Sequence, residues 1–339
     1  MTIVSIGVLA LNEEAYLPAL LEDIQAQTYP REKIEILLID SQSTDKTRQI
    51  MENFAERATG YFNIKILPNM KITQAEGWNV AIKNFKGDVL TRLDAHGRIP
   101  HDFIELNVKN IDAGEMVSGG VSKSLIIGES NWSKTLLQVE TSLFGSGFNL
   151  FHRALQKQYV KTMPRATYHR EVIEQVGFFN TRLGRTEDNE FHYRIRTRGF
   201  KLCLDPTIVS YLYVRPNLFK MLKQKYGNGY WVGLTLSVCP ACLSVFYFVP
   251  FLFVLAICFS LAMASAGIFI PGILLAGAYS FVSIMMTLIS IQKNGVSPYS
   301  IVMPILFFFL HLAYGIGTLI GFCTIPIFMR EMKIKSKVF

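Results

Sequence analysis

The chain has 339 residues and a net charge of +8, and half of its residues are hydrophobic. From Val232 to Met329 the only formally charged residue is Lys293. This composition excludes a wholly soluble protein, because a helix that packs on a soluble core keeps a polar face. Half of the net charge belongs to residues before Val232, so that larger part is nearly neutral for its size, and we expect no nucleic-acid partner.

The first hundred residues alternate short apolar runs with amphipathic stretches. Strands are predicted at 3–11, 35–40, 64–67 and 88–94, and helices at 16–28, 43–54 and 73–85. Alternation of this kind indicates parallel strands joined by right-handed crossovers. We therefore expect an α/β domain with a Rossmann-like, mostly parallel sheet.

Polar side chains stand where three of these strands end. They are Asn12, Asp40 and Asp94. In a parallel sheet the ligand binds beyond the carboxyl ends of the strands, so these three positions predict one binding site.

The middle of the chain gives a weaker signal. A strand is predicted around 116–120, and the apolar segment 132–151 is either an acceptor-site helix and loop or an interfacial element. Helices are then predicted at 170–176 and 187–199, followed by closing strands at 201–204 and 208–214.

The C-terminal third predicts membrane spans. Apolar segments lie at about 241–262, 268–290 and 300–322, and each is long enough for the roughly 20 helical residues that a bilayer requires. Three crossings would put the basic tail 330–339 outside the cell, against the tendency of basic residues to stay inside. Either one segment is re-entrant or interfacial, or the tail breaks that rule.

Asp94-Ala-His96 follows a predicted strand, so both side chains can point into one site. A carboxylate and an imidazole suit Mn²⁺, with Mg²⁺ as the other choice, and such an ion would neutralise a diphosphate. The alternative is that Asp94 caps a turn and His96 is simply exposed.

Thr186-Glu-Asp-Asn-Glu190 begins a predicted helix. Acidic residues stabilise a helix N-terminus, so capping alone would explain them. The functional alternative is a carboxylate pair, Glu187 and Asp188, of which one takes a proton from an incoming hydroxyl.

Taken in this order, the motifs resemble those of family 2 inverting glycosyltransferases with the GT-A fold, across residues 1 to about 231. The resemblance implies that Asp188 is the catalytic base, beside Glu187, and that Asp94 and His96 match the metal motif, in which the second position is usually Asp. It implies a donor-binding set made of Ala10, Asn12, Glu14, Asp40, Asn79, Arg92 and Asp94.

One branch of this family is matched more closely. Arg92-Leu-Asp-Ala-His96, Arg215-Pro216 and 224–231 look like the succinoglycan-type exopolysaccharide enzymes. That likeness implies transfer from a UDP-sugar to a polyprenyl-diphosphate-linked oligosaccharide, in exopolysaccharide or capsule biosynthesis. The Gln-x-x-Arg-Trp motif of processive synthases is not matched, which favours addition of a single sugar. A polyprenyl-phosphate sugar transferase and a non-catalytic scaffold of a polysaccharide assembly complex remain as alternatives.

These inferences give the expected organisation. A cytoplasmic GT-A domain at 1–231 is followed by a membrane region at 232–329 and a basic tail at 330–339, in a multi-pass protein of the plasma membrane. No secretory signal is recognised at the N-terminus. Lysines and aromatic residues favour the membrane interface, so a polyprenyl-linked acceptor is expected at Lys223, Gln224, Tyr226 and Trp231, with simple membrane anchoring as the alternative. His311, within the third span, is either functional or bonded to a neighbouring helix.

Overall fold

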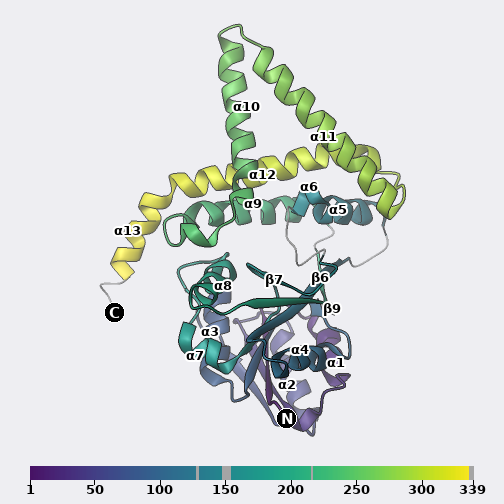
Figure 1. Ribbon diagram of the computed structural model, residues 1–339, viewed down its shortest axis with the longest axis vertical. Helices are drawn as coiled ribbons and strands as arrows, with labels where there is room; N and C mark the ends of the chain where they lie inside the picture. The colour runs from purple at the N-terminus through teal and green to yellow at the C-terminus, as the bar shows by residue number, and fades with distance from the viewer. Residues whose placement is uncertain (127–129, 147–153, 215–216, 336–339) are drawn as a thin grey trace. The chain divides into compact units, whose positions relative to one another are not determined.

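The computed structural model describes residues 1–126, 130–146, 154–214 and 217–335 (Figure 1). Two compact units share the chain. Unit 1 comprises Met1–Lys123 and Leu150–Tyr213, and unit 2 comprises Ser124–Asn149 and Val214–Phe339. Each unit is therefore built from two separate pieces of sequence. The division expected at 231, between a catalytic domain and a membrane region, stays a prediction.

One half of the sheet of unit 1 is parallel. β1 (Val4–Ala10) pairs in parallel with β2 (Ile34–Asp40) and β4 (Val89–Asp94), and β2 pairs in parallel with β3 (Asn63–Pro68). β1 and β2 are buried along their whole length, which is why their sequences are continuous apolar runs. The intervening helices are α1 (Leu17–Gln25), α2 (Thr47–Arg57) and α3 (Gln74–Asn84), close to their predicted bounds.

The other half of the sheet makes it a mixed sheet. β8 (Thr167–His169) pairs antiparallel with β4 and with β6 (Val117–Leu125). β9 (Leu202–Tyr213) pairs antiparallel with β5 (Gly97–Arg98) and β7 (Gln158–Val160). The two closing strands expected at 201–204 and 208–214 are thus one continuous strand. Further helices are α4 (Phe103–Asp112), α7 (Arg170–Val176) and α8 (Glu187–Thr197).

Helices cover both faces of this sheet (Figure 1). On one face Leu20 of α1, Phe54 of α2 and Phe103 of α4 pack on the strands. On the other face Trp78 of α3 and Phe191 of α8 are buried. These layers hold the carboxyl ends of β1, β2 and β4 in fixed positions, and they confirm the predicted α/β domain of GT-A type.

Unit 2 is helical. Its helices are α5 (Asn131–Thr141), α6 (Leu143–Ser146), α9 (Leu218–Thr235), α10 (Val249–Ser265), α11 (Ile270–Asn294), α12 (Met303–Cys323) and α13 (Ile325–Lys335). The helices at Val245–Ser265, Ile270–Asn294 and Ser300–Cys323 are long and apolar enough to cross a membrane. The first of them begins later than the predicted 241, because short 3-10 turns at Pro240–Cys242 and Val245–Phe248 precede α10.

Candidate active site

The register of the parallel strands brings the predicted site positions together. Ala10 lies opposite Asp40 in the β1–β2 pair, and Leu9 lies opposite Asp94 in the β1–β4 pair. The three strands therefore end side by side, as the sequence predicts. Their side chains and the loops that follow them form the edge at which a ligand would bind.

Asn12 joins two of the loops at this edge. It adopts a left-handed backbone conformation with φ of 55°, which Asn tolerates better than most residues. Its side-chain oxygen accepts a hydrogen bond of 2.8 Å from the backbone N–H of Thr44, and its own N–H donates to Ser43 Oγ. Asp40 Oδ1 accepts from the N–H of Ser43, and Glu14 accepts from the N–H of Lys46. The loop after β1 is thereby fixed to the loop after β2.

Asp94 lies between two donors that approach it without tight bonds. Gln74 Nε2 is 3.4 Å from Oδ1, and Arg165 is 3.6 Å from Oδ2. The Asp94 side chain remains 23% exposed, whereas that of Arg165 is 2% exposed. Burial lowers the pKa of Arg165, and the charge of Asp94 opposes that shift. Arg165 gave no signal in the sequence, because it reaches Asp94 only through the pairing of β4 with the 165–169 segment.

His96 does not share a tight cluster with Asp94. Its Nδ1 lies 3.0 Å from Glu13 Oε1. Burial lowers the pKa of His96, but the hydrogen bond to Glu13 and the charge of Asp94 outweigh burial, so the pKa is raised above its usual value. Within the described ranges, no three His, Cys, Asp or Glu side chains gather to hold a metal ion. A metal here would need ligands from the donor as well as Asp94.

Glu187 and Asp188 occupy the first turn of α8, as predicted. Thr186 precedes them with a left-handed φ of 68°. Glu187 is only 4% exposed, and burial together with the neighbouring Asp188 charge raises its pKa to about 8. Burial also raises the pKa of Asp188, and Arg92 works in the opposite direction. A pair of carboxyl groups in such surroundings retains a proton near neutral pH.

Arg92 is the counter-charge of this pair. Its guanidinium lies 4.4 Å from the ring of Trp78 and 4.6 Å from that of Phe179, so it is held between two aromatic faces. Burial lowers the pKa of Arg92, but the negative groups around it, including Glu187 and Asp94, raise it overall. Its Nε is buried without a hydrogen-bond partner in the described part of the chain.

Behind Arg92 stands a buried polar chain that the sequence did not reveal. Arg92 donates to Tyr168 Oη at 3.4 Å, and Tyr168 Oη lies 2.8 Å from His192 Nε2. His192 Nδ1 lies 2.9 Å from Thr162 Oγ1. Since arginine can only donate, we assign Tyr168 as donor to Nε2 and His192 as neutral. Burial and the nearby arginines hold the pKa of His192 well below its usual range, which agrees with this assignment.

The remaining predicted residues have other partners. The amide of Asn79 is buried, donates to the carbonyl of Phe179 and accepts from its N–H, which fixes α3 to the loop before α8. Ala10 is buried and its carbonyl accepts from Ser41. The donor-binding roles of both residues stay predictions.

The four residues predicted to bind the acceptor, Lys223, Gln224, Tyr226 and Trp231, all lie on α9 in unit 2. Lys223 is exposed, Tyr226 stacks on Tyr230, and Trp231 packs against Phe328. Arg215-Pro216 lies outside the described residues. The acceptor-binding role of the set stays a prediction.

Comparison with known proteins agrees with this fold. The model of "Glycosyl transferase family 2" matches residues 5–177. The chain is 30% identical over 324 residues to a dolichyl N-acetyl-alpha-D-glucosaminyl phosphate 3-beta-D-2,3-diacetamido-2,3-dideoxy-beta-D-glucuronosyltransferase of Methanococcus voltae, covering 93% of this chain and 96% of that protein. It is 26% identical to the succinoglycan biosynthesis protein ExoA of Rhizobium meliloti, covering 65% and 66% of the two chains.

Solved structures show the same fold. The mannosyltransferase PcManGT from Pyrobaculum calidifontis, in complex with GDP-Man and Mn²⁺, superposes with a TM-score of 0.63 at 17% identity, over 94% of this chain and 87% of that one. GalNAc-T7 with UDP, GalNAc and Mn²⁺ gives a TM-score of 0.50 at 17% identity, over 63% and 44%. The chain belongs to glycosyl transferase family 2 and is a glycosyltransferase with a GT-A fold.

Proposed function

We propose that this enzyme transfers a single hexose from a UDP-sugar to a polyprenyl-diphosphate-linked oligosaccharide, with inversion at the anomeric carbon. The reaction would serve exopolysaccharide or capsule biosynthesis at the cytoplasmic face of the plasma membrane. The observation that carries the proposal is the Glu187–Asp188 pair, held opposite Arg92 in a family 2 fold. Two relatives support the substrate class by name, since one acts on a dolichyl-linked sugar phosphate and the other belongs to succinoglycan biosynthesis.

Asp188 is the base in this proposal. It takes the proton of the acceptor hydroxyl while that oxygen bonds to the anomeric carbon from the face opposite the diphosphate, and the bond to the UDP oxygen breaks. Glu187, whose pKa of about 8 keeps it largely protonated at neutral pH, spares Asp188 a second adjacent negative charge. General-base assistance of this kind contributes about 10²–10⁴ in rate.

The donor would bind at the ends of β1, β2 and β4. Asp40, Asn12 and Glu14 lie in the loops there and are proposed to hold the nucleoside, and Asp94 lies at the third strand end. Mn²⁺ or Mg²⁺ fits Asp94, since its carboxylate is partly exposed and such ions bind one or two carboxylates plus substrate phosphates. When bound, the ion would supply charge neutralisation for the diphosphate. His96, oriented by Glu13, is the proposed second protein ligand or a diphosphate contact.

Removing the metal tests that part of the proposal. We expect chelation to abolish transfer and added Mn²⁺ to restore it, because the diphosphate charge would otherwise be uncompensated. The melting temperature measured in the same samples reports whether the protein stayed intact. Full activity in excess chelator would contradict the metal proposal and leave the assignment of the base untouched.

The activity itself is tested with purified full-length protein in lipid. UDP-, GDP- and dTDP-sugars are offered with three acceptors: a polyprenyl-diphosphate sugar, a polyprenyl-monophosphate sugar, and polyprenyl phosphate. We expect transfer from a UDP-sugar to the first acceptor and loss of at least about 10²-fold in kcat for Asp188→Asn with donor binding retained. Glu174→Gln, at an exposed acidic residue of α7, is the control and should be fully active.

Other outcomes would replace the proposal. Transfer to polyprenyl phosphate alone would make the enzyme a lipid-phosphate sugar transferase, which needs no base because its acceptor is already an anion. Transfer to the monophosphate-linked sugar alone would correct the acceptor and keep the mechanism. Near-normal turnover of Asp188→Asn would refute the assignment of the base.

A further inference from the structure

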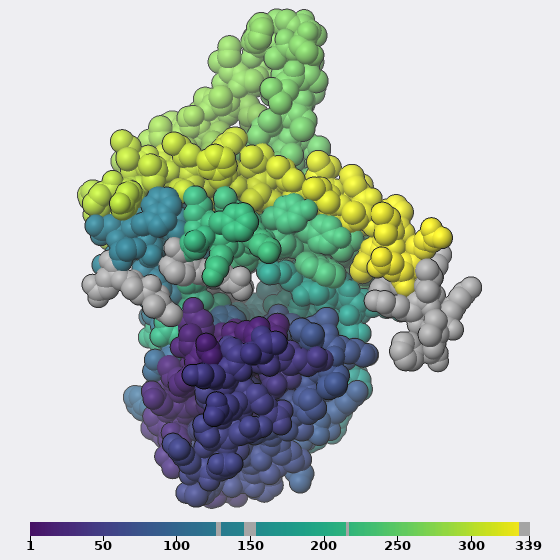
Figure 2. All heavy atoms as spheres, turned by 180° about the vertical axis from the view of Figure 1, so that it is seen from behind, coloured from purple at the N-terminus to yellow at the C-terminus, as the bar shows by residue number. Residues whose placement is uncertain are grey.

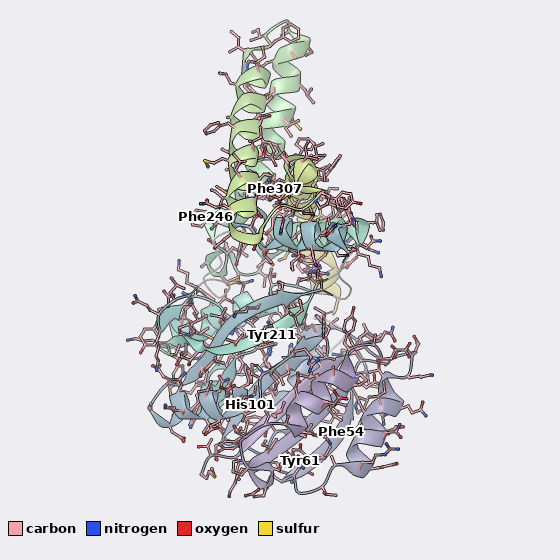
Figure 3. All side chains as sticks on the ribbon, turned by 90° about the vertical axis from the view of Figure 1, so that its right-hand side faces the viewer. Phe54, Tyr61, His101, Tyr211, Phe246 and Phe307 are labelled. Atoms are coloured by element: carbon pink, nitrogen blue, oxygen red, sulfur yellow. The ribbon has the colours of Figure 1, made fainter. Side chains whose placement is uncertain are left out.

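The three apolar helices of unit 2 have different surroundings. In the most apolar window of α12, 39% of the residues are buried, against 6% for α10 and 11% for α11. α10 and α11 stand as a hairpin, while α12 runs across its base beside α9 (Figure 1). A view turned by 90° shows α12 end-on, with Phe307 labelled, and the hairpin still upright (Figure 3). α12 therefore lies crosswise to the helices that resemble it most in composition.

Helix α9 packs so closely against α12 that the two backbones are in contact. Each helix carries two glycines four residues apart, Gly229 and Gly233 on α9 and Gly317 and Gly321 on α12. A Cβ atom on Gly317 would stand 2.2 Å from the carbonyl oxygen of Tyr226, and one on Gly229 would stand 2.0 Å from that of Tyr314. Small residues at this spacing let two helices approach closely, so α9 and α12 must lie at the same membrane depth where they meet.

The first half of α12 also lies beside the basic part of α9. Met303, Leu306 and Phe307 pack in one cluster with Met221 and Leu218. Lys220, Lys223 and Lys225 lie on that stretch of α9. If α12 crossed the bilayer, these lysines would be carried toward its interior, where a charged side chain is unfavourable.

Further hydrogen bonds join α12 and its flanking residues to α5, α6 and α9 along the length of α12. Before its start, Ser297 bonds to Thr135 of α5 at 2.8 Å. In its middle, His311 Nε2 lies 2.7 Å from the carbonyl of Phe144 of α6. After its end, Thr324 bonds to Tyr230 of α9. The alternative raised for His311 is thus settled in favour of hydrogen bonds to neighbouring helices, since its Nδ1 meets Tyr279 of α11.

Charge separates the two ends of the hairpin. The turn 266–269 between α10 and α11 has no charged residue, whereas Lys293 lies in the last turn of α11, where the chain returns toward α12. The lysines of α9 belong to the end of unit 2 that α12 occupies, and Arg330, Lys333, Lys335 and Lys337 follow α12 in the sequence. A crossing by α12 would place those tail residues on the side opposite α9. Without it, all these basic residues share one side.

The hairpin has the dimensions of a pair of crossings. The apolar helix Val245–Ser265, which includes α10, has 21 residues. Its length is about 31 Å, close to the roughly 30 Å of the hydrocarbon core. α11 has 25 residues and is inclined to α10 in Figure 1, as expected for a helix longer than the bilayer is thick.

We propose that, of the three long apolar helices in the described part of the chain, α10 and α11 cross the membrane, and that α12 lies in the plane of the interface with α5, α6 and α9, on the cytoplasmic side. In this arrangement α12 supplies the face toward the acyl chains, and the exposed Lys220 and Lys223 of α9 face the phosphates of anionic lipid, while Lys225 pairs with Glu140 of α5. From behind, α12 and α13 form one continuous band at the foot of the hairpin (Figure 2). The inference concerns unit 2 and does not depend on which sugar is transferred.

Cysteine accessibility tests the number of crossings in the full-length chain. In a background with Cys239, Cys258 and Cys323 replaced by Ser, single variants Ile268→Cys, Lys220→Cys and Arg330→Cys are treated with a membrane-impermeant maleimide. We expect Ile268→Cys to react in intact cells, and Lys220→Cys and Arg330→Cys to react only in inverted vesicles. Reaction of Arg330→Cys in intact cells would overturn the proposal.

Depth measurements test the in-plane position of α12. Spin labels at the exposed positions Ile305, Phe309 and Ile320 of α12 should give the same shallow depth. The matched positions Leu252, Leu255 and Phe259 of α10 should differ progressively in depth by about 1.5 Å per residue. A depth profile on α12 that passes through the bilayer centre would overturn the proposal, even with the tail on the cytoplasmic side.

Discussion

At the scale of single residues, the site combines side chains that stabilise the fold with side chains that reduce its stability when they are charged. The side chains of Asn79 and Asn12 form hydrogen bonds with backbone groups, and these bonds fix the positions of loops. Glu187 instead is an acid buried next to another acid. Such a residue lowers stability when it ionises, which is typical of active sites.

The pKa of Glu187 therefore predicts a pH-dependent stability. Its folded value of about 8 exceeds the usual 4.5, so its contribution is most favourable below pH 4.5 and is lost as pH rises through 8. The side chain of Glu187→Gln cannot ionise. The melting temperature of this variant minus that of the parent should therefore increase as the pH rises from 4.5 to 8. A melting-temperature difference that does not change with pH would contradict the assigned pKa.

Tyr168 gives a second prediction at this scale. Tyr168→Phe keeps the ring but leaves His192 Nε2 and Arg92 without the hydroxyl between them. An unsatisfied buried group costs about 1–3 kcal/mol, and we expect that loss in the free energy of unfolding. Tyr159→Phe removes a hydroxyl from a side chain that is 54% exposed and should cost within about 0.5 kcal/mol. Equal losses for the two variants would show that the buried chain adds nothing to stability.

Sequence patterns were most informative for residues next to regular elements. Asp40, Asp94, Glu187 and Asp188 were found because each stands at the end of a strand or the start of a helix with clear periodicity. Tyr168 was missed because β8 has three residues, too few to show a period, and Arg165 was missed because it precedes that strand and reaches Asp94 only in the folded sheet. His192 was missed because its partners lie in segments distant in sequence, and only folding brings them together.

At the scale of elements, the α9–α12 pair determines the form of unit 2. The sequence revealed α12 through its hydropathy, but the three lysines and the aromatic residues of α9 predicted an acceptor site or a membrane anchor, and no helix was predicted there. The paired glycines show that α9 is a continuous helix with a partner. Hydropathy reports the composition of a helix and not its direction, so it could not distinguish a crossing helix from one that lies in the plane.

This contact predicts the effect of a single methyl group. Gly317→Ala would place Cβ 2.2 Å from the carbonyl oxygen of Tyr226, so α9 and α12 would have to separate. Gly277→Ala on α11 is the matched control, because no atom lies within 4 Å of its Cβ position. We expect a lower melting temperature in lipid for Gly317→Ala alone. The same loss in both variants would mean that the helix contact is not the cause.

At the scale of the whole molecule, the two units alternate along the chain, so that each is assembled from two pieces separated by a piece of the other. The segment 124–149 interrupts unit 1 in sequence and folds with the C-terminal helices. Leu136 and Val139 of α5 are buried in a cluster with Phe307 and Leu310 of α12. The sequence assigns this segment to the catalytic domain, because nothing in it is as apolar as a membrane span, and leaves open whether 132–151 is an acceptor-site element or an interfacial one. Residues 147–151 of that prediction lie outside the described residues.

Truncation should expose this dependence. A chain ending at Tyr213 would retain α5 without α12, so Leu136 and Val139 would be left in water, and we expect the product to aggregate in the absence of detergent. The same truncation carrying Leu136→Gln and Val139→Gln should be more soluble, as judged by size-exclusion chromatography. Equal solubility of the two products would show that α5 does not need the membrane helices.

The inserted segment also limits how such an enzyme can diversify. His311 bonded to Phe144, and Lys225 paired with Glu140 at 3.1 Å, are matches between one particular loop and one particular set of helices. A recombination event that exchanged the C-terminal third alone would separate these partners. New combinations of a catalytic domain with a set of membrane helices should therefore arise only when the segment 124–149 and the C-terminal helices are exchanged together.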